Sequence, residues 1–316
     1  MTRGRIALVL GATGGVGHAV AQALLRHGWH VRALTRRPIA DRSGIEWVQG
    51  DAMRPEDVMR AADGVDILFH GVNPPRYRNW RGLAIPMLRN AITAAKASGA
   101  RLIYPGSVYN YGPDAWPVVA ETAPQNPRTR KGAIRVEMEA MLVAEARLGL
   151  RFLTVRAGDF FGPHAPSSWV TMIMLQGGKP LRRLSTPERP GVRHAWAYLP
   201  DLAETVAQLA ERERYLSPAE SFHFGGHSLR GRQMADAIRQ AMSGGLPIRS
   251  FPWALVYAAA PFDPTMRELL EMRYLWREEI TLDNTRLRSV LGTEPHTPLD
   301  EAVSATLAGL RPAKKG

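Results

Sequence analysis

The N-terminal stretch Ile6–Gly17 constrains the fold of this chain more than any other. Ile6–Leu10 is an unbroken apolar run of strand length, typical of a strand buried on both faces of a parallel sheet. Three glycines follow at intervals of three residues, and apolar residues then recur at helical spacing from Val16 to Leu25. This pattern predicts a strand, a tight turn and a helix. Such a turn aims free backbone N–H groups and the positive end of a helix dipole at one point, which suits a phosphate.

Each glycine of the turn has its own expected role. Gly11 allows the sharp turn, Gly14 lets the backbone approach a pyrophosphate, and Gly17 lets the helix pack closely on the strand. The other turn residues expected to contact the nucleotide are Thr13, Gly15 and Val16. The alternative is a glycine-rich turn without a ligand. The position of the glycines between a good strand and a good helix favours the nucleotide site.

The spacing Gly-x-x-Gly-x-x-Gly resembles that of the short-chain dehydrogenase/reductase superfamily. The form GATGGVG is most similar to its extended and atypical branches, which include the NAD-dependent epimerase/dehydratases. The resemblance covers essentially the whole chain. It implies an α/β fold, a Rossmann-type doubly wound parallel sheet with a smaller C-terminal substrate-side subdomain. The implied boundaries are 1–163 with 195–225 for the NAD(P)-binding domain, and 164–194 with 226–316 for the smaller subdomain.

Composition sets further bounds. The 316 residues suit one large α/β domain, or a large and a small one. The chain has no cysteine, which excludes disulfides, thiolate catalysis and cysteine-ligated zinc, and we expect no metal. The longest apolar run, Trp253–Phe262, is too short to span a bilayer, and Ile6–Leu10 is too short for the core of a signal peptide. We therefore expect a cytoplasmic protein that does not bind membranes.

The formal net charge is +12, and most of the positive charge is arginine. A strongly basic protein can bind nucleic acid or acidic ligands. The arginines of this chain are scattered, and the longest basic run is the short tail Arg311–Lys315. This distribution favours a general arginine bias, with a few arginines placed for phosphate groups, over nucleic-acid binding.

Arg36 and Arg37 follow the second predicted strand, His30–Thr35. An acidic residue at the end of this strand normally receives the ribose hydroxyls and selects NAD. This chain offers two guanidinium groups instead, and these can clamp a 2′-phosphate bidentately. The alternative is a pair of solvated surface arginines. The sequence therefore predicts NADP(H) in preference to NAD(H).

The third and fourth predicted strands add cofactor contacts. Ile45–Gly50 is followed by Asp51, which matches the family's aspartate beside the adenine. Its alternative role is the N-cap of a helix that begins near Pro55. Val65–Val72 resembles the family segment along the nicotinamide side of the cofactor. The contacts expected from that segment are His70, Gly71 and Val72. His70 is given no proton-transfer role.

Two further segments are expected on the substrate side. Asn73–Trp80 is a polar and aromatic loop after the carboxyl end of a strand, where ligands bind in open α/β sheets. We expect contacts to substrate or cofactor from Asn73 and Tyr77. Arg193 matches an arginine that contacts the nucleotide diphosphate in sugar-nucleotide members of the family, and Asp201 is interpreted as a helix N-cap.

Ser107 follows a predicted strand that begins at Arg101. Aligning Tyr111 and Gly112 with the family's Tyr-Gly pair puts Ser107 at the catalytic serine, whose hydroxyl hydrogen-bonds a substrate carbonyl or alcohol. A turn residue is the alternative. Tyr109 lies in the same segment and is an expected substrate contact.

The superfamily's acid/base motif, Tyr-x-x-x-Lys, is absent from this chain. Glu139 sets the register of the helix where it belongs, which puts Arg135 at the lysine position and Lys131 at the tyrosine position. Arg135 can bind ribose hydroxyls, and a desolvated Lys131 beside a guanidinium can act as an acid. Both residues can equally be solvated charges on a helix surface. The remaining alternatives for the acid are tyrosines from other elements, namely Tyr111, Tyr109 and Tyr77.

These features predict an enzyme that moves a hydride between NADP(H) and a carbonyl or secondary alcohol carbon of a small molecule. The alternative is a non-catalytic NADP(H)-binding regulator. A homodimer is expected through the helices Ile85–Ser98 and Ala133–Ala146, with an interface that includes Met138, Met141 and Leu142. The alternative is a monomer in which the same three residues are ordinary core.

The remaining segments complete the expected fold. Ser167–Gly178 reads as a helix and Lys179–Arg193 as a loop. The aromatic residues of Phe251–Trp276 are interpreted as helical core, and the alternative is that they line a substrate pocket. Leu299–Leu310 is a closing helix.

Overall fold

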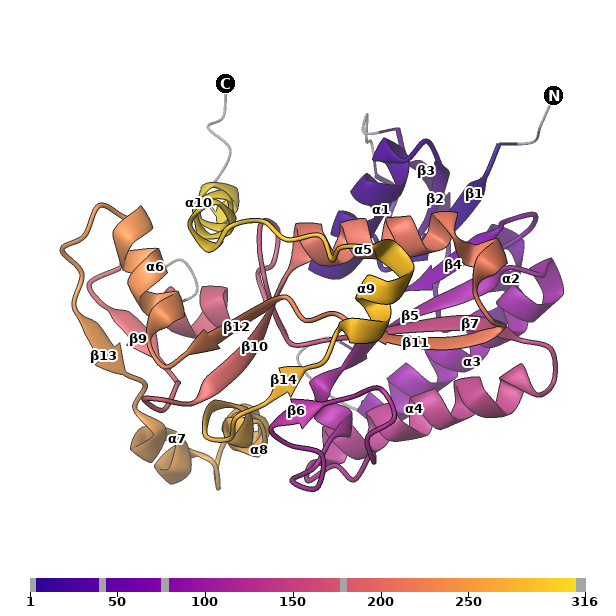
Figure 1. Ribbon diagram of the computed structural model, residues 1–316. Helices are drawn as coiled ribbons and strands as arrows, with labels where there is room; N and C mark the ends of the chain where they lie inside the picture. Colours follow the sequence, from indigo (N-terminus) through magenta and orange to yellow (C-terminus); the bar gives the residue numbers. More distant parts are fainter. Residues whose placement is uncertain (1–3, 40–43, 75–79, 177–180, 311–316) are drawn as a thin grey trace.

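A seven-stranded parallel sheet organises the larger part of the molecule, in the order β11-β7-β5-β4-β1-β2-β3 (Figure 1). The computed structural model describes residues 4–39, 44–74, 80–176 and 181–310. The strands are β1 (Ile6–Leu10), β2 (His30–Thr35), β3 (Glu46–Gln49), β4 (Ile67–His70), β5 (Arg101–Ser107), β7 (Arg151–Ala157) and β11 (Ala219–His223). The predicted doubly wound α/β fold is confirmed.

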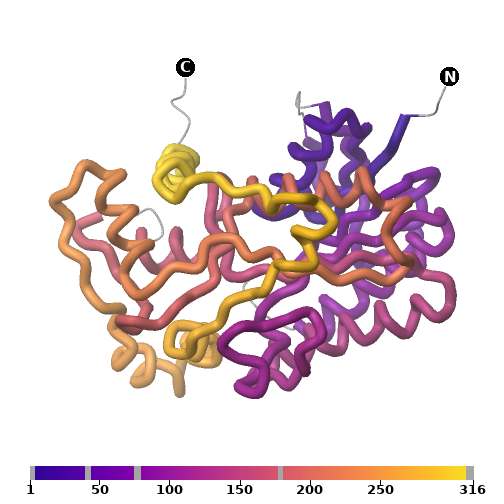
Figure 2. The backbone as a smooth tube through the Cα atoms, in the orientation of Figure 1, coloured from indigo at the N-terminus to yellow at the C-terminus, as the bar shows by residue number. Residues whose placement is uncertain are grey.

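Helices cover both faces of this sheet, which explains why its inner strands are nearly continuous apolar runs. One face carries α1 (Gly15–Arg26) and α5 (Leu199–Glu211). The other carries α2 (Pro55–Ala61), α3 (Trp80–Ser98) and α4 (Arg130–Ala146), and the tube in Figure 2 follows the same layers. The chain winds outward from β1 in both directions, so the carboxyl ends of β1 and β4 meet at the switch point where such sheets bind ligands.

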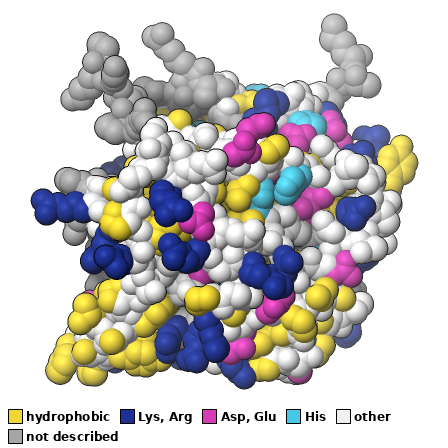
Figure 3. Space-filling model, turned by 60° about the vertical axis from the view of Figure 1, so that its left-hand side comes forward, with side chains coloured by type: hydrophobic (Ala, Val, Ile, Leu, Met, Phe, Trp, Pro, Cys, Tyr) yellow, Lys and Arg dark blue, Asp and Glu magenta, His cyan; other side chains and the backbone are white. Residues whose placement is uncertain are grey.

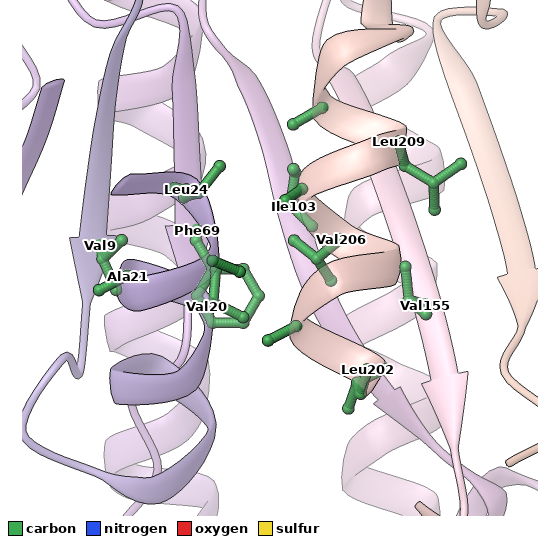
Figure 4. Close-up of a cluster of buried hydrophobic side chains, with 14 of the residues drawn as sticks. Val9, Val20, Ala21, Leu24, Phe69, Ile103, Val155, Leu202, Val206 and Leu209 are labelled. Atoms are coloured by element: carbon green, nitrogen blue, oxygen red, sulfur yellow. The ribbon is translucent and has the colours of Figure 1, made fainter. Parts of the chain in front are cut away.

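The α1 and α5 face is held by an apolar cluster. Val20 and Leu24 of α1 and Leu202 and Val206 of α5 pack over Phe69 in the sheet, and all five are at most 2% exposed (Figure 4). Burying each such side chain contributes about 1.5–3 kcal/mol. This face fixes α1, and with it the glycine turn, against β1 and β4.

On the opposite face, α4 packs its apolar side chains into the core of its own chain. Met138 is 2% exposed and Leu142 is fully buried, while Met141 is partly buried. The expected dimer interface is therefore wrong for Met138 and Leu142, because both already contact the sheet and α3. The exposed large apolar residue of α4 is instead Val143.

A smaller lobe lies beside the sheet, at the left of Figure 1. Its three-stranded sheet has the order β12-β10-β8, and two short pairs, β13-β9 and β14-β6, flank it. The strands are β6 (Val118–Val119), β8 (Asp159–Phe161), β9 (Leu184–Thr186), β10 (Arg193–Tyr198), β12 (His227–Arg230), β13 (Ile248–Ser250) and β14 (Thr281–Leu282). The helices and turns of this lobe are η3 (Val170–Met174), α6 (Gln233–Ala241), α7 (Trp253–Ala259), α8 (Pro264–Glu271), η6 (Arg273–Trp276) and α10 (Leu299–Leu310). Three other elements pack on the large part instead, namely η2 (Val108–Asn110) on α4, η5 (Glu213–Tyr215) on α5 and α9 (Thr285–Leu291) on β11.

The two parts are joined by very short connections. Gly158 is the one residue between β7 and β8, and a Cβ there would collide with the Ala195 backbone of β10. At another crossing, β10 runs directly into α5. The predicted domain boundaries stay a prediction.

Most predicted elements appear with small shifts, and β2 and α10 have the predicted bounds. The predicted helix Ser167–Gly178 is wrong, since the described part of that segment holds only the five-residue π-helix η3. The predicted loop Lys179–Arg193 contains β9. The interpretation of the late aromatics as core fails for Tyr257 and Phe262, which are 52% and 88% exposed. In the described part of the chain, the structure has no helix with the length and apolar content needed to cross a membrane.

Candidate functional site

The glycine turn joins β1 to α1 in the space left by β4. Gly11 has a φ of +86°, and a Cβ there would lie 2.6 Å from the carbonyl oxygen of Gly71. A Cβ on Gly17 would collide with the carbonyl of Gly11. Glycine is therefore required at both positions, once for the left-handed backbone and once for the close approach of helix to turn.

The amino end of α1 has the features of an anion site. Gly14 is the N-cap, no side chain caps the helix, and its first turn has no acidic residue. The N–H groups of Gly15, Val16 and Gly17 have no acceptor within the helix. Thr13 and Gly14 are exposed, so a diphosphate can reach these donors from solvent. The turn fits the nucleotide that its sequence predicts.

Arg36 and Arg37 lie directly after β2, and both are exposed. The hydroxyl of Thr35 donates to the Arg37 carbonyl at 2.9 Å and accepts from the Arg37 N–H at 3.3 Å. These bonds hold the turn that presents the two guanidinium groups.

Asp51 closes the turn after β3. Its carboxylate accepts from the N–H of Met53 at 3.0 Å, and its own N–H donates to Asp57 at 2.9 Å. The residue at the N-cap of α2 is Arg54. The alternative role of Asp51 as that N-cap is therefore wrong.

His70 ends β4 and is 1% exposed. Neither ring nitrogen has a hydrogen-bond partner among the described residues, and the ring stacks on Tyr104 with centroids 6.1 Å apart. Burial, and then the Arg135 guanidinium, lowers the pKa of His70 to about 3, so the imidazole is neutral near pH 7. Gly71 and Val72 are partly buried, Asn73 is exposed, and Tyr77 lies outside the described residues.

Ser107 ends β5 and begins η2. Its hydroxyl oxygen accepts from the N–H of Tyr109 at 3.2 Å, and the side chain is partly buried. Because β5 neighbours β4 in the sheet, Ser107 lies at the same carboxyl edge as the glycine turn and His70. This edge is where a nicotinamide and a reacting carbonyl would meet.

One face of α4 carries three charged side chains at intervals of four residues, and each binds a different element. The Lys131 ammonium lies 2.8 Å from a carboxylate oxygen of Glu268 in α8. Arg135 donates to the Tyr104 hydroxyl at 2.6 Å. Glu139 accepts from Arg156 at 2.6 Å.

The exposed fraction of Lys131 and Arg135 shows whether these charges are solvated. Lys131 is 3% exposed, and Arg135 is partly buried between Tyr104 and the ring of Trp80, which lies 5.0 Å from its guanidinium carbon. The alternative that Lys131 and Arg135 are solvated surface charges is therefore wrong.

Arg156 and Glu139 form a buried bidentate ion pair, and the two residues are 3% and 5% exposed. The Nε of Arg156 also donates to the Glu139 carboxylate, at 3.0 Å. A partly open cavity of about 460 Å³ lies between α4 and the strands β7 and β11, and this pair lines it. No residue of the glycine turn lines this cavity.

Tyr111 is fully buried, and its hydroxyl lies 2.7 Å from Nε2 of His223. His223 uses Nδ1 to donate to the Val119 carbonyl at 3.0 Å, so Nε2 accepts from Tyr111. Burial raises the pKa of Tyr111 and lowers the pKa of His223 to about 3. Tyr111 thus faces the interior, where a substrate meets it only after a rearrangement.

Tyr109 instead belongs to a chain of hydrogen bonds across the two lobes. Its hydroxyl donates to Oδ1 of Asp159 at 2.9 Å, and Oδ2 of Asp159 lies 2.9 Å from Nε2 of His194. Asp159 and His194 are 5% and 4% exposed. Sequence reasoning missed both, although His194 directly follows Arg193.

Arg193 lies near the surface of the smaller lobe. Its side chain is 41% exposed, donates to the Ser228 carbonyl at 3.3 Å and lies 3.6 Å from Glu279. Over the face in Figure 3, lysine and arginine side chains form separate groups with acidic and hydrophobic side chains between them. This arrangement is unlike a continuous basic surface for nucleic acid.

Asp201 lies inside the first turn of α5, whose N-cap is Tyr198, so the interpretation of Asp201 as the cap is wrong. Its carboxylate accepts from the N–H and the hydroxyl of Thr297, both at 2.7 Å. Asp201, His227 and His296 bring potential metal-ligand atoms within 4.8 Å of one another in the described residues. The two bonds to Thr297 give Asp201 a structural role at the start of α10.

Comparison with proteins of known sequence finds two partial relatives. Ceramide reductase of Caulobacter vibrioides is 34% identical over 113 residues, which are 34% of this chain and 35% of that protein. An NmrA-like family domain-containing oxidoreductase of Aspergillus, notA, is 40% identical over 76 residues, 22% of each chain. The alignments thus span about a third or less of the length of these relatives.

Comparison with solved structures extends over nearly the whole chain. A UDP-glucose-4-epimerase from Stenotrophomonas maltophila, solved with bound NAD and formylated UDP-arabinopyranose, has a TM-score of 0.78 at 16% identity over 98% of both chains. The Bordetella bronchiseptica enzyme WbmH in complex with NAD+ has a TM-score of 0.74 at 21% identity, covering 97% of this chain and 98% of that one. These likenesses show the fold. The NAD dependent epimerase/dehydratase family matches residues 7–225, and the chain belongs to this family.

Proposed function

We propose that the protein is an NADP(H)-dependent oxidoreductase or epimerase-like enzyme that moves a hydride to or from a carbonyl or secondary alcohol carbon. The observation that carries the proposal is the uncapped first turn of α1 beside two exposed arginines, Arg36 and Arg37, that follow β2. The donors of α1 suit a diphosphate, and the two guanidinium groups suit a 2′-phosphate.

The remaining cofactor contacts follow from the same edge of the sheet. Asp51, whose carboxylate lies in the turn after β3, would bind the adenine side. The segment His70–Val72 would lie along the nicotinamide. The buried, uncharged imidazole of His70 would contact the nicotinamide ring without transferring a proton. Arg135 would bind the ribose next to the nicotinamide.

The nicotinamide supplies or takes up the hydride, and the protein positions the substrate oxygen. The Ser107 hydroxyl is assigned to that oxygen, because it ends β5 at the ligand-binding edge. The proton donor is either Lys131, whose ammonium is paired with Glu268, or a tyrosine of the neighbouring η2. Tyr111 is the less favoured of the two tyrosine candidates for the proton donor, because its hydroxyl is buried and bonded to His223.

The substrate is proposed to be a small carbonyl compound or alcohol held by the smaller lobe. Asn73, Tyr77 and Tyr109 are its proposed contacts, and Arg193 would bind a diphosphate if the substrate is a sugar nucleotide, a class that the solved relatives with bound UDP-sugars support. The name of the partial relative, ceramide reductase, supports a long-chain carbonyl compound as the other class. A homodimer through α3 and α4 would use the exposed side of α4 around Val143.

Cofactor preference is tested by calorimetry with NADPH and NADH on wild type and on Arg36→Ala/Arg37→Ala. Each charge-assisted hydrogen bond contributes roughly 1.5–3 kcal/mol, or about 10- to 100-fold in affinity. The variant removes at least two such bonds, so it should lose about 100-fold or more in NADPH affinity and keep its NADH affinity. Arg89→Ala is the matched control, because Arg89 is an exposed arginine on α3, over the opposite face of the sheet from α1. Equal affinity of wild type for the two cofactors would refute the preference.

The alternative is a regulator that binds NADP(H) without turnover. It is favoured by the absent Tyr-x-x-x-Lys motif and by the engagement of Lys131 with Glu268. Tight NADPH binding with no oxidation of bound NADPH by any carbonyl probe, together with a change in oligomeric state or protein partner, would support it.

A further inference from the structure

Tyr109, Asp159 and His194 form a buried unit whose hydrogen bonds cannot be satisfied without an additional proton. Nδ1 of His194 lies 2.9 Å from the Leu275 carbonyl oxygen, which only accepts, so Nδ1 carries a proton. Nε2 then faces Oδ2 of Asp159 at 2.9 Å. A neutral imidazole and an ionised carboxylate would place two acceptors against each other. One more proton must therefore lie between Nε2 and Oδ2.

The surroundings stabilise that proton. The ring of His194 stacks on Trp276 with centroids 3.9 Å apart and an interplanar angle of 10°, and Trp196 meets its edge at 4.8 Å. An indole face attracts an imidazolium ring. Asp159 and His194 are almost fully buried, so the pair exchanges this proton only along its own hydrogen bonds.

Tyr109 is the residue of this unit through which a proton can reach a bound substrate. Its hydroxyl bonds Oδ1 of Asp159 at 2.9 Å, and Tyr109 is partly exposed where the two other residues are not. It lies two residues after Ser107, whose hydroxyl accepts from the Tyr109 N–H. Burial acts to lower the pKa of Arg135, but Tyr104 and then Tyr109 raise it, so the Tyr109 hydroxyl lies within electrostatic reach of this guanidinium.

We infer that Tyr109 is the proton donor that replaces the missing motif tyrosine, and that Asp159 and His194 are positioning residues that hold the proton behind it. The inference rests on the proposed function. As the substrate carbonyl receives a hydride from reduced nicotinamide, the C=O electron pair moves to oxygen. The Tyr109 O–H bond then breaks and an O–H bond forms on the substrate. Asp159 takes the Nε2–H proton and its carboxyl group turns so that the new O–H donates to the phenolate, and solvent later restores the proton that the unit has lost.

Other titratable groups face this unit. Glu188 lies in electrostatic reach of His194, and burial raises its pKa to about 7. Tyr274, from η6, packs near Asp159, and burial followed by the Asp159 charge raises its pKa. The Tyr274 hydroxyl has no hydrogen-bond partner in the described structure, so it does not exchange a proton with the unit.

Asp159→Asn distinguishes a role in holding a transferable proton from a purely structural role. The amide oxygen can accept from Tyr109, and the amide nitrogen can donate to Nε2 of a neutral His194 that still donates to Leu275. Every hydrogen bond of the unit is kept, while the transferable proton is removed. A merely structural role therefore predicts no loss of function in this variant.

The first measurement is nitrogen NMR of the full-length protein labelled on histidine, with His194→Gln identifying the His194 signal among the nine histidines. At neutral pH, His194 of wild type should carry protons on, or shared at, both ring nitrogens, and in Asp159→Asn only on Nδ1. A His194 ring with a single protonated nitrogen in wild type would overturn the inference, whether or not a substrate is turned over.

The second measurement is NADPH oxidation with phenanthrenequinone, and NADP+ reduction with UDP-glucose, as probes. Tyr109→Phe should lower kcat about 100-fold with unchanged NADPH affinity, and Asp159→Asn should lower kcat and shift its pH profile. Tyr274→Phe is the matched control and should turn over at the wild-type rate. Wild-type kcat in Tyr109→Phe, or a wild-type pH profile in Asp159→Asn, would overturn the inference. Failure of wild type to bind NADPH would refute the proposed function and leave the NMR result to decide on the proton.

Discussion

Replacing Arg156 by methionine should destabilise the protein more than any surface charge substitution. Arg156→Met leaves the Glu139 carboxylate, 5% exposed, without the two N–H groups that bind it at 2.6 and 3.0 Å. Removing one partner of a buried ion pair costs about 3–5 kcal/mol. Because the pair lines the 460 Å³ cavity, water can hydrate the remaining carboxylate in part, which puts the expected loss near the lower limit.

Thermal unfolding followed by circular dichroism measures this loss. At roughly 2–4 °C per kcal/mol for a chain of a few hundred residues, a loss of about 3 kcal/mol lowers Tm by about 6–12 °C. The double variant Arg156→Met/Glu139→Leu removes both charges and should regain most of this stability. Arg81→Met is the matched control, because Arg81 of α3 pairs with Glu137 of α4 at 2.7 Å but its side chain is 69% exposed, and the substitution should cost less than about 1 kcal/mol. A double variant as unstable as Arg156→Met would show that the methionine side chain, and not the unpaired charge, causes the loss.

Two further predictions concern the turn and the smaller lobe. Gly11→Ala should abolish nucleotide binding in calorimetry and lower stability by more than Gly28→Ala, since both glycines have positive φ, +86° and +74°, but only Gly11 has backbone within 3 Å of an added Cβ; equal effects would contradict a close-packing role. Burial raises the pKa of Glu188 to about 7 from 4.5, so the folded state holds a proton that the unfolded state releases between these values, and stability falls as pH rises through this window. Glu188→Gln should remove up to about 3 kcal/mol of that fall between about pH 5 and pH 8 in urea titrations, and an unchanged pH dependence would show that Glu188 is not its source.

The sequence carried enough information for the fold because the pattern of the sheet is local. Ile6–Leu10 is a short apolar run and His30–Thr35 is a short mixed segment between turn signals, and both form strands with the predicted bounds. The segment Ser167–Gly178 contains a nearly continuous apolar run, Trp169–Leu175, which does not by itself distinguish a helix from a strand. Tertiary packing left only the π-helix η3 there, because Val170 and Met174 insert into the core of the smaller lobe.

The candidate site was predictable where backbone chemistry defines it and unpredictable where long-range contacts do. Gly11 and Gly17 act through their lack of a Cβ, which a spacing reveals. Asp159 meets Tyr109 across 50 residues and His194 across 35, and no spacing indicates such a contact. Likewise, the burial of Lys131 depends on Glu268, 137 residues away in α8.

The single residue between β7 and β8, and the direct passage of β10 into α5, limit how this molecule can be divided. Natural modules are usually joined by exposed linkers that few contacts cross. Here one strand of the smaller sheet continues from the large sheet, and another leads into a helix that covers it. A chimaera that exchanges the smaller lobe for that of another protein must therefore cut through paired strands, and it would replace Asp159 and His194 together. Altered specificity in such a chain is reached more readily by point substitution than by recombination of whole parts.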